Sequence, residues 1–336
     1  MVARMTIKEI ARLSGVGVST VSRVLNKRPD VNEDTRGRVM EVIDRYGYEP
    51  NSNAKHLKQL STDCVAVIVR GRNNLFFSGI LELLQKRIEA AGLRFLPHYI
   101  DENDDEAAAA LRVYAERKVR GIIFMGGCHT DNGAMLSRLP IPCVYSTVNA
   151  AEGHAPNVSS VSVDDRQGAK KAIDYLFDCG HENMVILSGE TQGCNMAHQR
   201  YLGVLDSFKE HGKTLESSRV LVSPFSFSCA YERIKEYTGP DYTAIFAMSD
   251  TMAIGAARAL MDSGKRVPED VSVIGYDGIE LAQYYHPALA TMRQPQQELA
   301  DRSVELLLES MDTDCAPKHI QLETELIQGA SVKHIS

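Results

Sequence analysis

The stretch MTIKEIARLSGVGVSTVSRVLN, residues 5–26, decides the fold of the N-terminal part of the chain. Thr6 followed by Glu9 has the spacing of a capping box, in which the hydroxyl accepts a backbone N–H and the glutamate reaches back to the cap. Apolar side chains then recur on one helical face, at Ile7, Ile10 and Ala11. Residues 14–17, Ser-Gly-Val-Gly, interrupt this pattern, and residues 18–25 restart it. The stretch therefore predicts two short helices joined by a tight turn.

The second of these helices carries a polar face. Its apolar positions are Val21, Val24 and Leu25, which leaves small polar groups and one arginine opposite them: Ser19, Ser22 and Arg23. An α-helix fits the major groove of DNA, where such side chains can contact base edges. The pattern favours a helix-turn-helix whose second helix reads DNA. The alternative is an ordinary helical hairpin with a solvated polar face.

Three further motifs follow in order. Asn32 can cap a third helix that stops at Gly47, and the sequence Tyr-Glu-Pro-Asn occupies residues 48–51. Residues 52–58 place Ala54 and Leu57 at helical spacing. The succession TIKEIARLSGV, TVSRVLN, YxPN and AKHLK closely resembles the DNA-binding head and hinge of the lactose/galactose repressor (LacI/GalR) family.

Composition and charge restrict the function further. The 336 residues include 44% hydrophobic and 24% charged side chains, and no apolar run reaches the roughly 18–20 residues of a membrane span. The net charge is −7, but residues 1–60 carry +4 and the remainder −11, so phosphate binding is expected at the head. Seven scattered cysteines without a CxxC motif predict neither zinc nor a disulfide framework. We expect a cytoplasmic protein without a membrane partner.

The body of the chain alternates β-branched runs with helical patterns. Apolar strands are predicted at residues 65–69, 93–96, 121–125 and around 141–145, and after a loop at 149–160 the alternation starts again from a helix at 167–179. Such alternation is typical of parallel, doubly wound α/β domains. Two successive units predict two lobes, with ligands held at the carboxyl ends of the strands.

The body also resembles the LacI/GalR family, through motifs such as SVDDRQGA (162–169), MSDTMAIGA (248–256) and DVSVIGYDG (270–278). The resemblance implies an all-α helix-turn-helix head with an α/β periplasmic-binding-protein-like core of two doubly wound lobes. Its boundaries would be a DNA-binding domain at 1–50, a hinge helix or linker at 51–61, a first lobe at 62–162 and 292–312, and a second lobe at 163–291 and 313–336.

The resemblance also implies DNA-contacting residues in the head and hinge. They are Thr6, Val18, Ser19, Thr20, Ser22, Arg23, Asn26, Asn51, Ala54, Leu57 and Lys58. Arg23 can pair with guanine, whereas Val18 can meet only a thymine methyl or other apolar surface. The alternative for Val18 is that it packs within the head. Leu57 corresponds to a wedge that enters the minor groove and kinks the duplex, or it packs against the body.

For the core, the resemblance implies effector contacts from eight residues: Phe76, Phe77, Thr147, Arg200, Phe225, Ser249, Asp250 and Asp277. A carboxylate and a guanidinium at strand ends suit polyhydroxylated ligands, because both make charge-assisted hydrogen bonds. Alternatively, Arg200 and Asp277 pair with each other or cap helices, and each aromatic ring belongs to the core. Asp164 and Asp165 are expected at the surface and hinge.

Departures from the family pattern bear on the ligand. Thr147 stands where many members carry aspartate, Ser249 where asparagine is frequent, and Cys194 and Met196 occupy positions that are often polar. These residues predict a less acidic, more apolar pocket than a typical free-sugar site.

We therefore predict that the chain is a transcription regulator that binds a pseudo-palindromic operator as a homodimer. We expect it to be a repressor controlled by a sugar or sugar derivative. A nucleobase or nucleoside effector and an activator role are the alternatives. A transport protein would lack the basic head. The sequence contains no Walker, GxSxG, HExxH or GxGxxG motif, so nothing in it indicates an enzyme. No catalytic residue, metal site or cofactor is expected.

Overall fold

The computed structural model describes residues 6–25, 31–46, 63–71, 74–101, 104–127, 133–151, 155–192, 196–313 and 315–335. The chain divides into two compact units, Met1–Ser61 and Thr62–Ser336, each of which is described by itself. In the described ranges no helix combines the length and the apolar character needed to cross a bilayer.

The N-terminal unit is a three-helix domain, with helices α1 (Ile7–Ser14), α2 (Val18–Leu25) and α3 (Glu33–Tyr46). The capping box is present: the Thr6 N–H donates to Glu9 Oε2 at 2.7 Å, and Glu9 N donates to the Thr6 hydroxyl at 3.4 Å. Gly15 ends α1 with φ +68°, a conformation that a side chain would strain. A small buried core joins the three helices, formed by Ile10, Ala11, Val21, Val24, Val31, Val39 and Ile43.

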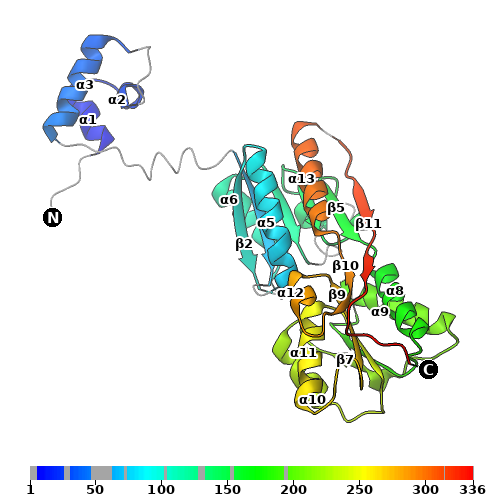
Figure 1. Ribbon diagram of the computed structural model, residues 1–336. Coiled ribbons are helices and arrows are strands. Elements are labelled where there is room, and N and C mark those ends of the chain that lie inside the picture. Colours follow the sequence, from blue (N-terminus) through cyan, green and yellow to red (C-terminus); the bar gives the residue numbers. More distant parts are fainter. Residues whose placement is uncertain are drawn as a thin grey trace. The chain divides into compact units, whose positions relative to one another are not determined.

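The second unit contains two six-stranded sheets, each of which forms one lobe (Figure 1). The first sheet has the order β11-β5-β4-β3-β1-β2 and is entirely parallel. Its strands are β1 (Cys64–Arg70), β2 (Arg94–Ile100), β3 (Gly121–Met125), β4 (Cys143–Ser146), β5 (Val158–Val163) and β11 (His319–Leu322). The central strands are buried on both faces, which explains their continuous apolar runs.

Helices cover both faces of this first lobe. Alternate residues of the central strands pack toward α5 (Leu75–Ala90) and α13 (Gln296–Asp312), and the intervening residues pack toward α6 (Glu106–Arg117) and α7 (Gly133–Leu136). The Asn74 side chain caps α5 by accepting from the backbone N–H groups of Phe76 and Phe77. This cap fixes the point at which the chain leaves β1 and enters the helix.

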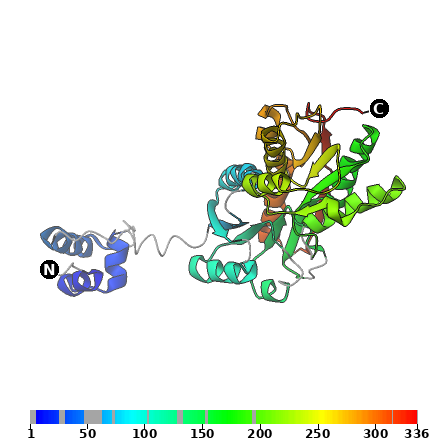
Figure 2. The same ribbon diagram turned by 90° about the horizontal axis from the view of Figure 1, so that it is seen from below.

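The second lobe has the strand order β12-β10-β9-β8-β6-β7. Its strands are β6 (Met184–Ser188), β7 (Val220–Val222), β8 (Ala244–Ala247), β9 (Ser272–Asp277), β10 (Ala290–Arg293) and the antiparallel β12 (Glu325–Ile327). Helices α8 (Asp165–Asp178) and α9 (Met196–Glu210) lie on one side (Figure 2). On the other side lie α10 (Phe227–Lys235), α11 (Asp250–Asp262) and α12 (Glu280–Tyr284), and the short 3₁₀ helix η2 (Ser217–Arg219) precedes β7.

The chain passes between the lobes three times, which corrects two predicted boundaries. Residues 292–293 belong to β10 of the second lobe, so the crossing comes at least two residues later than predicted. The assignment of all of 313–336 to the second lobe was wrong, because β11 pairs with β5 in the first sheet before β12 returns to the second. Figure 1 shows this red segment running from one lobe to the other.

The loop predicted at residues 149–160 was also partly wrong, because β5 begins at Val158. The sequence of β5 (Val158–Val163), VSSVSV, has the serine content of a loop, yet every residue of this strand is buried. Their hydroxyls have backbone partners: Ser159 accepts from Lys318 N, and Ser160 accepts from Ala150 N, both at 3.1 Å. Paired in this way, the serines can be buried in a sheet at little cost.

Candidate functional site

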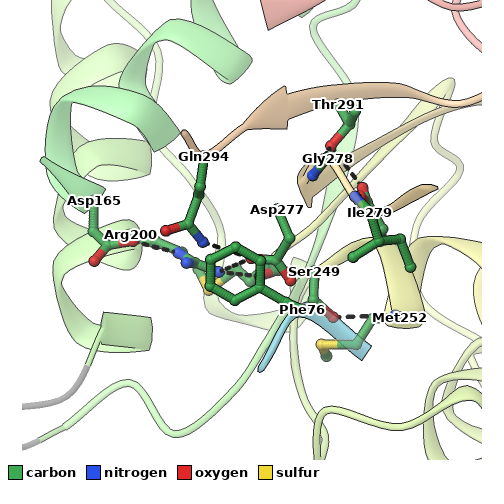
Figure 3. A network of polar contacts seen from close by, with 12 residues as sticks. Phe76, Asp165, Arg200, Ser249, Met252, Asp277, Gly278, Ile279, Thr291 and Gln294 are labelled. Atoms are coloured by element: carbon green, nitrogen blue, oxygen red, sulfur yellow. Dashed lines mark hydrogen bonds and ion pairs between the residues drawn. The ribbon is translucent and has the colours of Figure 1, made fainter. Parts of the chain in front are cut away.

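A buried ion-pair network lies at the carboxyl ends of the second-lobe strands (Figure 3). Arg200 on α9 is 1% exposed, and its Nε donates to Asp165 Oδ1 at 2.7 Å. Its Nη1 lies 3.6 Å from Asp277 Oδ1 at the end of β9 and also donates to the Met248 carbonyl. Arg200 and Asp277, predicted to contact an effector, therefore pair with each other, as the alternative reading of the sequence proposed.

The guanidinium of Arg200 is also held by an aromatic ring. Its central carbon lies 3.7 Å from the centroid of the Tyr276 ring, within cation–π range. Tyr276 is fully buried, and space for its hydroxyl exists because residue 168 is a glycine: an added Cβ would lie 2.4 Å from that oxygen. The second lobe therefore fixes Arg200 from the side by carboxylates and from one face by a ring.

The network holds more carboxylates than the single guanidinium of Arg200 could neutralise. Burial raises the pKa of Asp277 to about 7, partly opposed by the Arg200 charge, and burial also raises the pKa of Asp165. Burial and the neighbouring Asp277 raise the pKa of Asp250 to about 8. Three buried carboxylates and one guanidinium would leave excess negative charge if all were ionised, so the network retains protons near neutral pH.

Asp250 and Ser249 organise the start of α11. Asp250 is fully buried, and its oxygens accept from Ile279 N at 2.8 Å and from the Thr291 hydroxyl at 2.6 Å. The Ser249 side chain accepts from Met252 N at 3.2 Å as the helix cap. Protein donors therefore already occupy both side chains: Asp250 positions the loop that follows Asp277, and Ser249 fixes the start of α11.

The predicted aromatic residues differ in their exposure. Phe76 and Phe77 are only 4% and 5% exposed and belong to a hydrophobic cluster that includes residues of both lobes. Both rings therefore lie in the core, which was the alternative to effector contact in the sequence analysis. Figure 3 shows Phe76, carried by α5 of the first lobe, pointing toward the Arg200–Asp277 pair. Phe225 is half-buried and packs on Gly189, where a Cβ would lie 2.4 Å from its ring.

Thr147 lies at the carboxyl end of β4 in an unusual conformation. Its φ of +82° is rare for a β-branched residue, and its hydroxyl accepts from Gly126 N at 3.4 Å. Gly126 in turn packs against the Phe77 ring. Thr147, Gly126 and Phe77 therefore meet at one edge of the first sheet. Met196 begins α9 and is half-buried against the core, whereas Cys194 lies outside the described residues.

Four polar residues of this region were missed or misplaced by sequence reasoning. Asp165 was expected at the surface but is buried, because its position at the start of α8 faces Arg200. In the first lobe, Arg70 Nη2 donates to Glu106 Oε2 at 2.9 Å, and the Tyr145 hydroxyl donates to Glu106 Oε1 at 2.6 Å. Glu106 is 1% exposed. The sequence does offer one signal for the first-lobe pair: Arg70 comes directly after a predicted strand, and Glu106 begins a predicted helix.

The candidate DNA-reading helix α2 presents most of its predicted contacts to solvent. Val18 is 42% exposed rather than packed, Ser19 and Arg23 are exposed, and Thr20 and Ser22 are half-buried. Thr6 is exposed and caps α1. The predictions for Asn26, Asn51, Ala54, Leu57 and Lys58 fall outside the described residues. Within the described part of the chain, no cluster of His, Cys, Asp and Glu is arranged to hold a metal.

A helix-turn-helix unit joined to a two-lobed core with buried polar groups at its strand ends defines a class: DNA-binding regulators with a ligand-binding core. Residues 6–51 match the bacterial regulatory proteins of the lacI family, and residues 173–332 match the periplasmic binding protein-like domain. The transcriptional regulator MalR of Clostridium butyricum is 35% identical, covering 98% of this chain and 100% of that protein. The chain therefore belongs to the lacI family and is a DNA-binding transcription regulator, not an enzyme.

Other relatives extend this comparison. The transcriptional repressor PurR of Vibrio vulnificus is 32% identical, over 98% of this chain and 99% of that protein. The transcriptional regulator CelR in complex with cellobiose is 29% identical, with a TM-score of 0.72 over 98% of this chain and 100% of that chain. The lac repressor dimer bound to operator and an anti-inducer shares the fold, at 23% identity and a TM-score of 0.73 over 98% of this chain and 99% of that chain.

Proposed function

We propose that this cytoplasmic regulator represses transcription by binding a pseudo-palindromic operator as a homodimer, under the control of a small polyhydroxylated molecule held between its lobes. The observation that carries the effector proposal is the Arg200–Asp277 pair at the strand ends of the second lobe. Such groups can exchange their mutual contact for hydrogen bonds to ligand hydroxyls. The affinity for the ligand and the affinity for the operator would then be coupled, because the two partners would favour different lobe arrangements.

The charge of the network restricts the class of ligand. The carboxylates of Asp165, Asp250 and Asp277 outnumber the one guanidinium of Arg200. A ligand that offers hydroxyl or N–H groups can hydrogen-bond to the oxygens of this network, whereas a phosphate group would add negative charge beside buried carboxylates whose ionisation is already disfavoured. We therefore propose an uncharged sugar as effector. The relative named PurR keeps a nucleobase or nucleoside as the second candidate, since ring N–H groups also donate and Phe225 offers an aromatic surface.

The head supplies the DNA-binding part of the proposal. Arg23, Ser19 and Val18 lie exposed on α2, and the unit carries a positive charge against an acidic remainder. Two half-sites of a pseudo-palindrome require two heads, which is why we propose a homodimer. Sedimentation velocity with and without an operator duplex would test this: a monomer that binds DNA as a monomer would contradict it.

The effector proposal is tested by thermal shift. The panel would contain glucose, maltose, cellobiose, glucose 6-phosphate, hypoxanthine and adenosine, with wild type, Asp277→Ala and the control Asp270→Ala, whose carboxylate pairs at the surface with Arg266. A ligand at 100 times its Kd adds about 2.7 kcal/mol to stability. We expect a neutral sugar to stabilise wild type and Asp270→Ala but not Asp277→Ala. A shift that persists in Asp277→Ala would place the site elsewhere, and stabilisation by the phosphosugar alone would refute the charge argument.

A further inference from the structure

The three connections between the lobes all end on the same polar network. The chain crosses from β5 to α8 at residues 163–165, from β10 to α13 at residues 293–296, and from β11 to β12 at residues 322–325. The angle between the lobes can change only if these three segments change. Their side-chain contacts therefore decide which lobe arrangement is stable.

The first crossing is attached to Arg200. Asp165, the first residue of α8, accepts from Arg200 Nε at 2.7 Å. The preceding residue, Asp164, donates its backbone N–H to the carbonyl of Leu322 at 3.2 Å, which joins the first crossing to the third. A displacement of Arg200 would therefore act on two of the three segments.

The second crossing is attached to Asp277 twice. Gln294 is 3% exposed, its Nε2 donates to Asp277 Oδ1 at 2.8 Å, and its backbone N–H donates to the Asp277 carbonyl at 3.1 Å. Asp277 itself has φ +109°, which an L-residue rarely adopts. Gln294 thus holds the backbone and the carboxylate of the same strained residue.

The third crossing lies beside Tyr276. Thr324 is 7% exposed, and its hydroxyl shares the space over Gly168 with the Tyr276 hydroxyl: a Cβ there would lie 2.8 Å and 2.4 Å from the two oxygens. The ring of Tyr276 carries the Arg200 guanidinium 3.7 Å from its centroid. Through these contacts the third crossing depends on the same guanidinium as the first.

We propose that Gln294 is the positioning residue through which Asp277 sets the angle between the lobes, with Asp165 and Thr324 anchoring the other two crossings. The relevance of Gln294 to the effector rests on the proposed function, since a ligand bound to Arg200 and Asp277 would compete with Gln294 for hydrogen bonds to Asp277. The second crossing also borders an open groove of about 840 Å³ lined by Gly278, Gln294 and the first turn of α13.

Distances between spin labels test this directly and need no effector. Nitroxides would be attached through a ketone amino acid at two exposed positions of the full chain, Glu116 on α6 and Lys209 on α9, and diluted with unlabelled protein. The variants are Gln294→Met and Thr324→Val. The matched control is Gln297→Met, because Gln297 lies three residues away and its side chain donates to Asp301 in its own helix, at 3.1 Å.

We expect one narrow interlobe distance for wild type and Gln297→Met, and a second, displaced population for Gln294→Met and Thr324→Val. An unchanged distribution in both test variants would overturn the proposal, and so would an equal change in Gln297→Met. If Gln294→Met does not fold, judged by its circular dichroism, Thr324→Val decides alone. Because no effector is present, failure here is distinguishable from failure of the effector proposal, which the thermal-shift panel measures separately.

Discussion

Replacement of Arg200 by methionine should destabilise the core in a pH-dependent way. The substitution keeps an unbranched side chain of similar length but removes a guanidinium that is 1% exposed, donates to Asp165 at 2.7 Å and lies 3.6 Å from Asp277. Breaking a buried ion pair on one side costs about 3–5 kcal/mol, because it leaves uncompensated charge in the interior. Against a total stability of roughly 5–15 kcal/mol, this is a large fraction.

The matched control is Arg166→Met. Arg166 also pairs with an aspartate, Asp206, at 2.5 Å, but its side chain is 51% exposed. Exposed pairs contribute about 0–1 kcal/mol, because water already solvates both charges. The two substitutions are the same in chemistry and differ in burial, so their difference isolates the cost of the unpaired carboxylates.

The assay is urea unfolding followed by circular dichroism at pH 8 and pH 5. At pH 8 we expect Arg200→Met to lose about 3–5 kcal/mol of unfolding free energy and Arg166→Met to lose far less. At pH 5 the loss for Arg200→Met should shrink, because the unpaired carboxylates can take up protons. Equal losses for the two variants at pH 8, or a loss for Arg200→Met that does not depend on pH, would refute this reasoning.

Three further predictions can be measured. Burial raises the pKa of Asp277 to about 7, so above pH 5 the folded chain keeps a proton that the unfolded chain has released, and the stability of the wild type should fall as the pH rises from 5 to 8. Melting temperatures measured over this range should fall less steeply for Asp277→Asn. An identical slope for the two proteins would contradict the assignment of this proton to Asp277. Gly168→Ala places a methyl group 2.4 Å from a buried hydroxyl oxygen and should cost about 1–3 kcal/mol in unfolding free energy, whereas Gly37→Ala, which meets nothing within 4 Å, should stabilise α3 by roughly 0.5–1 kcal/mol. Arg23→Met should weaken operator binding by about 1–3 kcal/mol in a gel-shift titration, and Arg45→Met, on α3, should not; an equal loss would mean that α2 does not read bases.

The parts of the fold that depend on local pattern were predictable. The capping box of Thr6 and Glu9 and the strands at 65–69 and 121–125 follow from spacing and apolar runs over a few neighbouring residues. The resemblance added the order of the domains. It also indicated that the end of the chain returns to the second lobe, which β12 does.

The missed features depend on contacts between distant segments. The serines of β5 suggest a loop until Lys318, 159 residues away from Ser159, supplies the partner of a buried hydroxyl. Asp165 is charged and next to a second aspartate, and only the arrival of Arg200 on another helix makes its burial favourable. Neither the placement of β11 in the first sheet nor the Gln294–Asp277 contact has a local signal.

The most direct test of the account is a fluorescence-anisotropy titration of a duplex that the full chain selects from a randomised library, with each compound of the thermal-shift panel present or absent. The account predicts a pseudo-palindromic duplex, and at least one neutral sugar that changes its Kd by roughly tenfold in wild type and leaves it unchanged in Asp277→Ala. A Kd that no compound changes, or a change that survives in Asp277→Ala, would contradict control of DNA binding through the Arg200–Asp277 pair.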